Sequence, residues 1–228
     1  MTEVAPFDWS SVKAAVLDRS REPEILAELD AACLKDGRLQ AMPAAYYARW
    51  PQNDLSLWCC RRGFYCLPTL ELIEFVQAQI GGDSAIEIGA GNGALGRALG
   101  VPLTDSFQQE RPEVRELYVN QLGHATVPYG SDVEKLTALE AVEKYRPRVV
   151  VAAWVTHRFN RERPNLHGNM HGVDETKLLQ KKCVRKYIFV GHERVHSTKP
   201  ILQRRHETHA PPLYSRATSG RNVVWIWG

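Results

Sequence analysis

The chain has 228 residues, of which 44% are hydrophobic and 24% are charged. This ordinary globular composition excludes fibrous and low-complexity proteins and leaves enough length for one well-packed core. No apolar run approaches the ~20 residues that a membrane-spanning helix needs, and the N-terminal stretch lacks an apolar signal core. We therefore expect a cytoplasmic protein without membrane contact. Five cysteines, an odd number in a chain of this size, argue against a disulfide framework.

The net charge of +3 is unevenly distributed along the chain. Residues 181–228 contain ten Lys or Arg and two Asp or Glu, a net +8, so the remaining 19 basic and 24 acidic residues give −5. A basic C-terminal third could bind the phosphates of a nucleic acid, although a solvated charged face is the commoner meaning of such an excess.

The first 64 residues predict a helical and irregular N-terminal extension. Apolar residues at helical spacing predict helices between Asp8 and Leu39. Residues 37–68 are rich in aromatic residues and interrupted by proline, which predicts an irregular segment. Thr69 then stands as the N-cap of a helix over residues 70–80, and Gly81 and Gly82 end it.

Residues 65–228 alternate between strand and helix patterns. Strands are predicted at residues 85–88, 102–105, 125–130, 148–154, 186–191 and 219–228, with helices between most of them. The runs RVVVAAW and KYIFVG are apolar throughout, as in central strands of a parallel sheet. This alternation predicts an α/β domain over 65–228 with a mostly parallel sheet flanked by helices.

A glycine loop follows the first of these strands, in the sequence AIEIGAGNGALGRALG (residues 85–100). Glycines at this place permit tight turns and let backbone N–H groups approach a ligand at the carboxyl end of the sheet. Gly91, Gly93 and Gly96 also match the dinucleotide pattern G-x-G-x-x-G, which would indicate an NAD(P)-dependent oxidoreductase. However, the acid expected ~20 residues later is absent, since Asp105 comes too early, and Glu87 would repel a pyrophosphate.

The residues AIEIGAGNG resemble the first motif of the class I S-adenosylmethionine-dependent methyltransferases, an acidic residue followed by G-x-G-x-G. The resemblance covers residues 65–228 and implies a Rossmann-like, seven-stranded sheet, S-adenosylmethionine as the cofactor and methyl transfer as the activity. It also implies that the glycine loop packs against the methionine part of the cofactor and that the acid orders the loop. The loop residues concerned are Glu87, Gly89, Ala90, Gly91 and Gly93.

The same resemblance assigns roles to four residues outside the loop. Asp105, at the tip of the second strand, would accept hydrogen bonds from the ribose hydroxyls. Asp132 would follow the third strand and lie by the adenine, with Val133 as the apolar neighbour of the ring. Tyr65 would belong to the front wall of the pocket.

The fourth strand would deliver AWVTH to the reaction centre. Methyl transfer needs proximity, alignment and sometimes a base. His157 is the candidate base, the alternative being a loop histidine without a role. Trp154 could stack on a planar acceptor or contact the sulfonium, the alternative being a core residue. Because AWVTH replaces the Asn/Asp-Pro-Pro-Tyr of nitrogen-methylating relatives, a catalytically inactive binding module is the alternative function.

The histidine pairs His167/His171 and His192/His196 have a spacing of four, but glycine and proline make both segments poor helices, and no H-E-x-x-H occurs. We therefore predict no metal. The methyl acceptor is left open among a small molecule, a nucleic acid and a protein.

Overall fold

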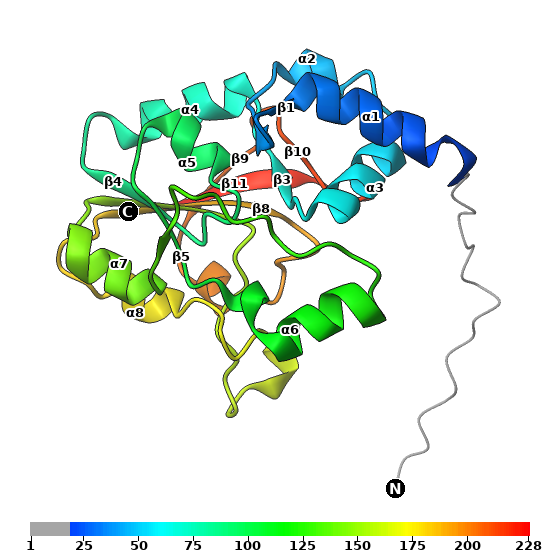
Figure 1. Ribbon diagram of the computed structural model, residues 1–228. Helices are drawn as coiled ribbons and strands as arrows, with labels where there is room; N and C mark the ends of the chain where they lie inside the picture. The colour runs from blue at the N-terminus through cyan, green and yellow to red at the C-terminus, as the bar shows by residue number, and fades with distance from the viewer. Residues whose placement is uncertain (1–18) are drawn as a thin grey trace, which may run out of the picture.

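The computed structural model describes residues 19–228 (Figure 1). Its centre is a seven-stranded sheet in the order β6-β5-β4-β7-β8-β11-β9. The first five of these strands run parallel, and β11 is antiparallel to both of its neighbours. In sheet order the strands are β6 (Glu134–Lys135), β5 (Leu103–Asp105), β4 (Ala85–Ile88), β7 (Val149–Ala153), β8 (Lys186–His192), β11 (Asn222–Trp227) and β9 (Glu207–His209). The predicted α/β fold with a seven-stranded, mostly parallel sheet is confirmed.

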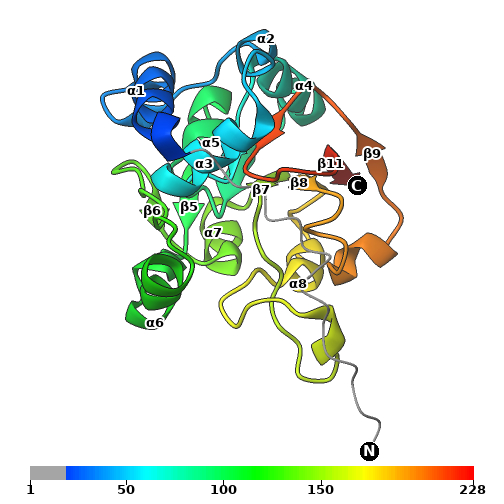
Figure 2. The same cartoon turned by 90° about the vertical axis from the view of Figure 1, so that its right-hand side faces the viewer.

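Helices cover both faces of this sheet (Figures 1 and 2). The helices α4 (Leu70–Ile80) and α5 (Ala94–Leu99) lie on one face, and α7 (Ala138–Tyr145) and α8 (Glu175–Leu179) on the other. Side chains alternate along the strands, so Val149 and Val151 pack toward α4 and α5 while Val150 and Ala152 pack toward α7 and α8. Both faces of β7 are therefore buried, which explains its continuous apolar sequence.

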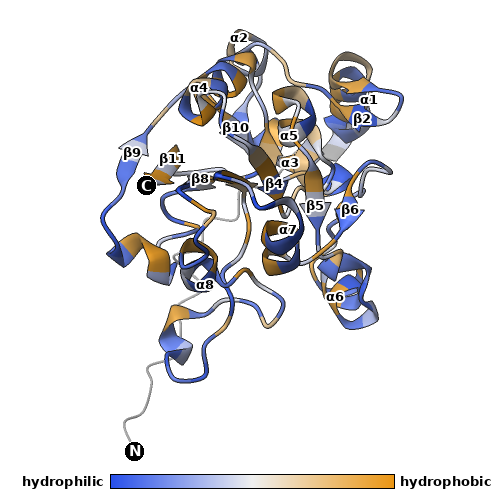
Figure 3. Ribbon diagram, turned by 90° about the vertical axis from the view of Figure 1, so that its left-hand side faces the viewer, coloured by the Kyte–Doolittle hydropathy of each residue, from blue (hydrophilic) through white to orange (hydrophobic). Residues whose placement is uncertain are grey.

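Hydropathy follows the same layers. Figure 3 shows apolar residues concentrated in central strands such as β4 and β5, whereas the edge strand β9 is hydrophilic. A polar edge strand discourages pairing with another chain. No helix within residues 19–228 has the length and apolar character that crossing a membrane requires.

The N-terminal segment forms more regular structure than the sequence predicts. It contains α1 (Glu22–Cys33), the hairpin β1 (Leu34–Lys35) and β2 (Arg38–Leu39), α2 (Ala44–Tyr47), α3 (Gln52–Arg62) and β3 (Cys66–Leu67). The prediction of an irregular segment over residues 37–68 is wrong where α3 forms. That helix begins after Pro51 and ends at Gly63, which is left-handed, and it buries Leu55, Trp58 and Cys59. Of the helices expected from Asp8 to Leu39, the part before residue 19 lies outside the described residues.

The N-terminal segment packs directly against the sheet domain. Its apolar cluster includes Ala94 of α5, and β3 pairs with β10 (Tyr214–Ser215) near the C-terminus. The Gln52 amide donates hydrogen bonds to the Ser215 and Ala217 carbonyls, both at 2.8 Å. These contacts place the segment next to the glycine loop.

One further expectation differs from the structure. No strand forms over residues 125–130, and the third strand of the parallel part is β6 instead. Between β5 and β6 the chain forms α6 (Pro112–Glu116), which is continued by a π-helix at Leu117–Gln121. The helix α8 before β8 has only five residues. Short 3₁₀ helices occur at Arg19–Arg21, Gln108–Glu110, Pro164–Leu166 and Pro200–Gln203.

Candidate functional site

The glycine loop joins β4 to α5 with a backbone that only glycine adopts easily. Gly89, Gly91 and Gly93 have φ angles of 58°, 56° and 76°. A Cβ atom on Gly89 would lie 2.3 Å from Val155 Cγ1, so the loop can approach the end of β7 only without a side chain there. Asn92 Oδ1 accepts a hydrogen bond from Ala94 N at 2.8 Å and helps to start α5.

We expect Gly89→Ala to destabilise the fold by about 2–5 kcal/mol. The left-handed backbone costs an alanine about 1–2 kcal/mol, and the overlap with Val155 adds about 1–3 kcal/mol. Urea unfolding measures the sum. The matched control is Gly82→Ala, because Gly82 also has a positive φ of 84° but nothing lies within 4 Å of its added Cβ. Equal losses in the two variants would show that Val155 does not constrain the loop.

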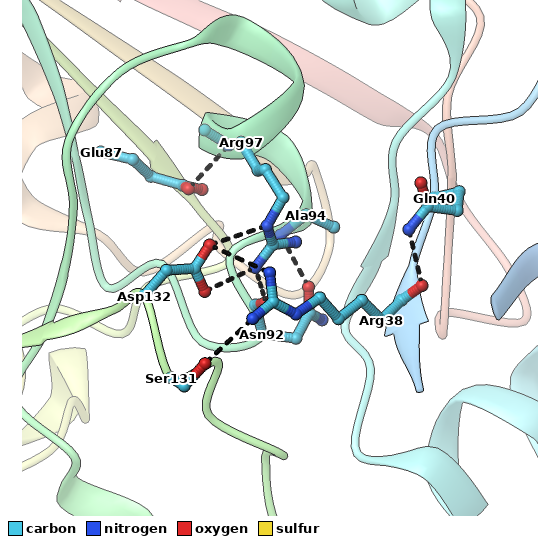
Figure 4. Close-up of polar contacts among 9 residues, drawn as sticks. Arg38, Gln40, Glu87, Asn92, Ala94, Arg97, Ser131 and Asp132 are labelled. Carbon is cyan, nitrogen blue, oxygen red and sulfur yellow. Dashed lines mark hydrogen bonds and ion pairs between the residues drawn. The ribbon is translucent and has the colours of Figure 1, made fainter. Parts of the chain in front are cut away.

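Glu87 is buried in β4 on the face that α5 covers. Its Oε2 accepts a hydrogen bond from Gly96 N at 2.8 Å and so ties α5 to the strand (Figure 4). A Cβ atom on Gly96 would lie 2.5 Å from this carboxylate oxygen, so the third glycine of the pattern permits close packing of helix on strand. Burial and the nearby Asp105 charge raise the Glu87 pKa to about 8, although the hydrogen bond from Gly96 N lowers it. At neutral pH this side chain is therefore mostly protonated.

Asp105 ends β5 and connects that strand to the glycine loop. Its side chain accepts hydrogen bonds from Gly91 N at 3.0 Å and from Phe107 N at 2.8 Å. The residue is only 8% exposed, and burial raises its pKa although these N–H groups oppose the rise. The Asp105 carboxylate therefore links the end of β5 to the glycine loop that follows β4.

A cavity of about 340 Å³ opens at the carboxyl ends of β4, β5, β6 and β7. This edge of a parallel sheet is where open α/β proteins bind ligands, and the volume falls within the range of small-molecule sites. Seven of the eleven predicted site residues line the cavity: Tyr65, Glu87, Gly89, Ala90, Gly91, Asp105 and Trp154. The other four, Gly93, Asp132, Val133 and His157, do not line it.

Asp132 lies before the third strand, because β6 begins at Glu134, and not after it as the sequence predicts. Its carboxylate makes a bidentate ion pair with Arg97 of α5, with both N···O distances 2.9 Å (Figure 4). The hydrogen bonds from Arg97 hold the pKa of Asp132 below its usual range. The residues that do follow β6, Leu136 and Thr137, line the cavity.

Val133 and Gly93 take part in packing around the glycine loop but do not line the cavity. Val133 is buried in a small apolar cluster with Ala90 and Leu103. Gly93 takes the N-cap position of α5, where a Cβ atom would lie 2.9 Å from Leu103 Cδ1. Both residues shape the loop without reaching the cavity.

His157 is turned away from the glycine loop, contrary to the expectation of a base at the reaction centre. Its Nε2 lies 3.0 Å from the Leu166 carbonyl oxygen, and its backbone bridges to Val173. It lines a second cavity, which Leu166 and residues of α8 also line. Burial, with the Lys199 charge, lowers its pKa. The bridge between residues 157 and 173 fixes this orientation, which no local pattern in the sequence indicates.

Trp154 stands at the end of β7 with a left-handed backbone, φ 57°. Its ring centroid lies 6.2 Å from that of Tyr65 and 5.1 Å from that of His196. Among the described residues the buried indole Nε1–H finds no hydrogen-bond acceptor. A non-glycine residue in this conformation, together with an unpaired buried donor, is typical of functional sites.

Gln109 is a site residue that sequence reasoning misses. Its amide nitrogen donates to the Tyr65 hydroxyl at 2.9 Å, and its amide oxygen accepts from Val127 N at 2.9 Å. Its backbone N–H donates to the Tyr129 hydroxyl at 3.2 Å. Gln109 thereby fixes one wall of the cavity. Its partners lie 18 to 44 residues away along the chain, so no local signal could reveal it.

Several basic residues of the C-terminal third have internal roles. Lys199 is buried, Arg216 lies over the Tyr65 ring at 4.6 Å, and Arg221 and Lys181 pair with acidic side chains.

Within residues 19–228, no three His, Cys, Asp or Glu side chains are grouped so that they could hold a metal ion. Neither the models of known protein families nor the curated proteins with which the chain was compared match it.

Proposed function

We propose that the protein binds S-adenosylmethionine in the cavity at the carboxyl edge of the sheet and transfers its methyl group to an acceptor. The observation that carries this proposal is the joint placement of the glycine loop and Asp105 on one cavity. The strand order, with one antiparallel strand next to the far edge, supports the resemblance to class I methyltransferases.

The charges of the site favour this cofactor over a dinucleotide. Glu87 and Asp105 both line the cavity, and among residues 19–228 neither makes an ion pair or side-chain hydrogen bond with a basic side chain. The Asp105 carboxylate disfavours a pyrophosphate and suits hydroxyl donors, and Glu87, which a bound cation would help to ionise, suits a cationic ligand. The cofactor would supply an electrophilic methyl group on a sulfonium.

The chain's own residues would then bind and orient. The backbone of Gly89–Gly91 would face the amino-acid end of the cofactor, and Asp105 would accept hydrogen bonds from the ribose hydroxyls. Leu136, which follows the third strand, would take the place by the adenine for which Asp132 was expected. Trp154 would face the acceptor, because it lines the cavity at the end of β7. The proposed cofactor site therefore includes Asp105 and excludes Asp132.

The test is calorimetry of the purified chain with S-adenosylmethionine, S-adenosylhomocysteine and, as a comparison, NAD⁺ and NADP⁺. Micromolar binding of the first two alone is expected. Asp105→Ala removes acceptors for two hydroxyl hydrogen bonds and should weaken binding by about 10- to 100-fold. Asp83→Ala is the matched control, since Asp83 lies at the amino end of β4 and pairs with Arg148.

Binding that is unchanged in Asp105→Ala would reject the assigned site, and preferential binding of NAD⁺ or NADP⁺ would reject the cofactor. Thermal unfolding of each variant separates lost binding from lost folding, because Asp105→Ala also leaves Gly91 N and Phe107 N without their acceptor.

A binding module without turnover is the second candidate. It is favoured by one observation, the placement of His157 outside the cavity. If S-adenosylhomocysteine binds but labelled methyl groups reach no component of a cell extract, this second function replaces the first.

A further inference from the structure

One end of the cavity carries basic side chains that the proposed cofactor would not use. Arg111 and Arg158 both line it, together with Thr156, Met170 and His171. None of these residues is assigned to the cofactor, so this part of the cavity is available to an acceptor.

Backbone hydrogen bonds hold the main chain at both arginines, which are exposed; Arg111 N donates to the Gln108 carbonyl at 3.2 Å. Arg158 N donates to the Val173 carbonyl at 2.9 Å, and residues 158 and 169 form a second bridge. Arg111 directly precedes α6, and His171 Nε2 lies 3.9 Å from Glu113 Oε1 in the first turn of that helix. The start of α6 and the segment 169–173 therefore lie close together, and Arg111 and residues 170–173 line the same cavity.

Within residues 19–228, the acidic side chains of the cavity have hydrogen-bond or ion-pair partners, whereas the guanidinium groups of these two arginines have none. Glu87 and Asp105 accept backbone hydrogen bonds, and Asp174 accepts from Lys177 N at 3.1 Å and pairs with Lys177 Nζ at 3.7 Å. Among the described residues, no ion pair or side-chain hydrogen bond involves the guanidinium of Arg111 or Arg158. Two unneutralised guanidinium groups on one cavity favour an oxyanion.

The surroundings favour a planar ligand. Trp154, Tyr65 and Tyr118 line the same cavity as the two arginines. The buried indole N–H of Trp154, which no described residue accepts, offers a further hydrogen bond to a polar ligand atom. Aromatic walls and a donor suit a ring with a polar substituent.

We infer that the methyl acceptor is a planar ring bearing an oxyanion, a phosphate or a carboxylate, which Arg111 and Arg158 bind. That the bound ring accepts a methyl group rests on the proposed function, whereas the oxyanion site itself does not depend on it. Phosphate and carboxylate share the same bidentate recognition by guanidinium groups.

The test is calorimetry with two anionic probes, each paired with a neutral analogue, on protein saturated with S-adenosylhomocysteine. The pairs are AMP with adenosine and 4-hydroxybenzoate with 4-hydroxybenzyl alcohol. At least one anion should bind about tenfold or more tightly than its neutral analogue, and the preference should fall with added salt. Which anion binds distinguishes phosphate from carboxylate.

Variants decide whether the two arginines cause this preference. Arg111→Gln with Arg158→Gln should abolish it while the affinity for S-adenosylhomocysteine changes by less than about twofold, since neither residue is assigned to the cofactor. Arg185→Gln, an exposed position directly before β8 at the opposite edge of the sheet, should retain it. The inference is overturned if neither anion is preferred, or if the preference survives in the double variant.

If S-adenosylhomocysteine itself does not bind, the cofactor proposal fails, and the same probe pairs titrated without it still test the oxyanion site. A retained preference for AMP over adenosine, lost in the double variant, would then support an anion-binding site without methyl transfer.

Discussion

Lys199→Met is expected to destabilise the fold by about 3–5 kcal/mol, because it leaves the Glu175 carboxylate buried without its cation. The exposed fractions of the two side chains are 1% and 3%, and Lys199 Nζ lies 3.0 Å from Glu175 Oε1. The Tyr187 hydroxyl donates to the same carboxylate oxygen at 2.8 Å. Lys199 Nζ also donates to the Val155 carbonyl at 2.9 Å and lies over the Phe189 ring.

The matched control for this variant is Lys181→Met, which breaks a surface pair with Glu143 and should cost less than about 1 kcal/mol. The double variant Lys199→Met with Glu175→Gln should recover part of the loss, because no unpaired charge is then buried. Chemical unfolding at pH 7 measures all three. A loss as small as that of the control would mean that water reaches Glu175 in the folded protein.

The buried pair of Lys199 and Glu175 is also connected to the candidate site through Val155. Val155 follows Trp154 and contacts the glycine loop at Gly89, so the hydrogen bond from Lys199 holds the end of β7 against that loop. Lys199 is thus a positioning residue for the cavity wall.

Glu87→Gln is expected to stabilise the protein at alkaline pH and to weaken cofactor binding. The folded-state pKa of Glu87, about 8, exceeds its ordinary value of 4.5. The folded protein therefore retains a proton that the unfolded chain releases between these values, and stability falls as pH rises through this window. The difference corresponds to at most about 5 kcal/mol. Glutamine stays neutral and can still accept the hydrogen bond from Gly96 N.

Thermal unfolding of the wild type and Glu87→Gln from pH 5 to pH 9 measures this effect. The two proteins should be about equally stable at pH 5, and the variant should gain roughly 2–4 kcal/mol over the wild type by pH 9. Glu74→Gln, an exposed position on α4, is the control. A difference that does not change with pH would contradict the burial of an ionisable group at position 87.

The same variant shows whether Glu87 affects cofactor binding through its charge or through the conformation of the glycine loop. At pH 9, where Glu87 of the wild type is ionised, loss of the carboxylate should weaken binding of S-adenosylmethionine by about tenfold and binding of S-adenosylhomocysteine by less, because only the first carries a sulfonium charge. Equal losses would indicate that Glu87 acts only through the order of the loop.

The sequence predicts much of the sheet correctly, and several residues that line the cavity, because those features depend on local patterns. Continuous apolar runs identify β7 and β8, and the spacing of glycines after β4 identifies a loop with positive φ angles. Asp105 is found for the same reason, since it directly ends a strand that pairs with β4. By contrast, α3 is missed because its aromatic and cysteine residues mask an ordinary buried face between Pro51 and Gly63.

Only the tertiary structure decided which side chains that lie far apart in the chain become partners. The two-residue strand β6 has no apolar pattern of its own, so only its pairing with β5 shows that Asp132 precedes the strand and binds Arg97. The bridge to Val173 turns His157 toward Leu166, and the burial of Lys199 beside Glu175 withdraws one charge from the basic C-terminal third. The amino-acid sequence by itself determined where the backbone can turn and which strands are buried, because these depend on neighbouring residues. Which charged groups face the cavity depends on strand register and long-range pairing, and therefore on the folded chain as a whole.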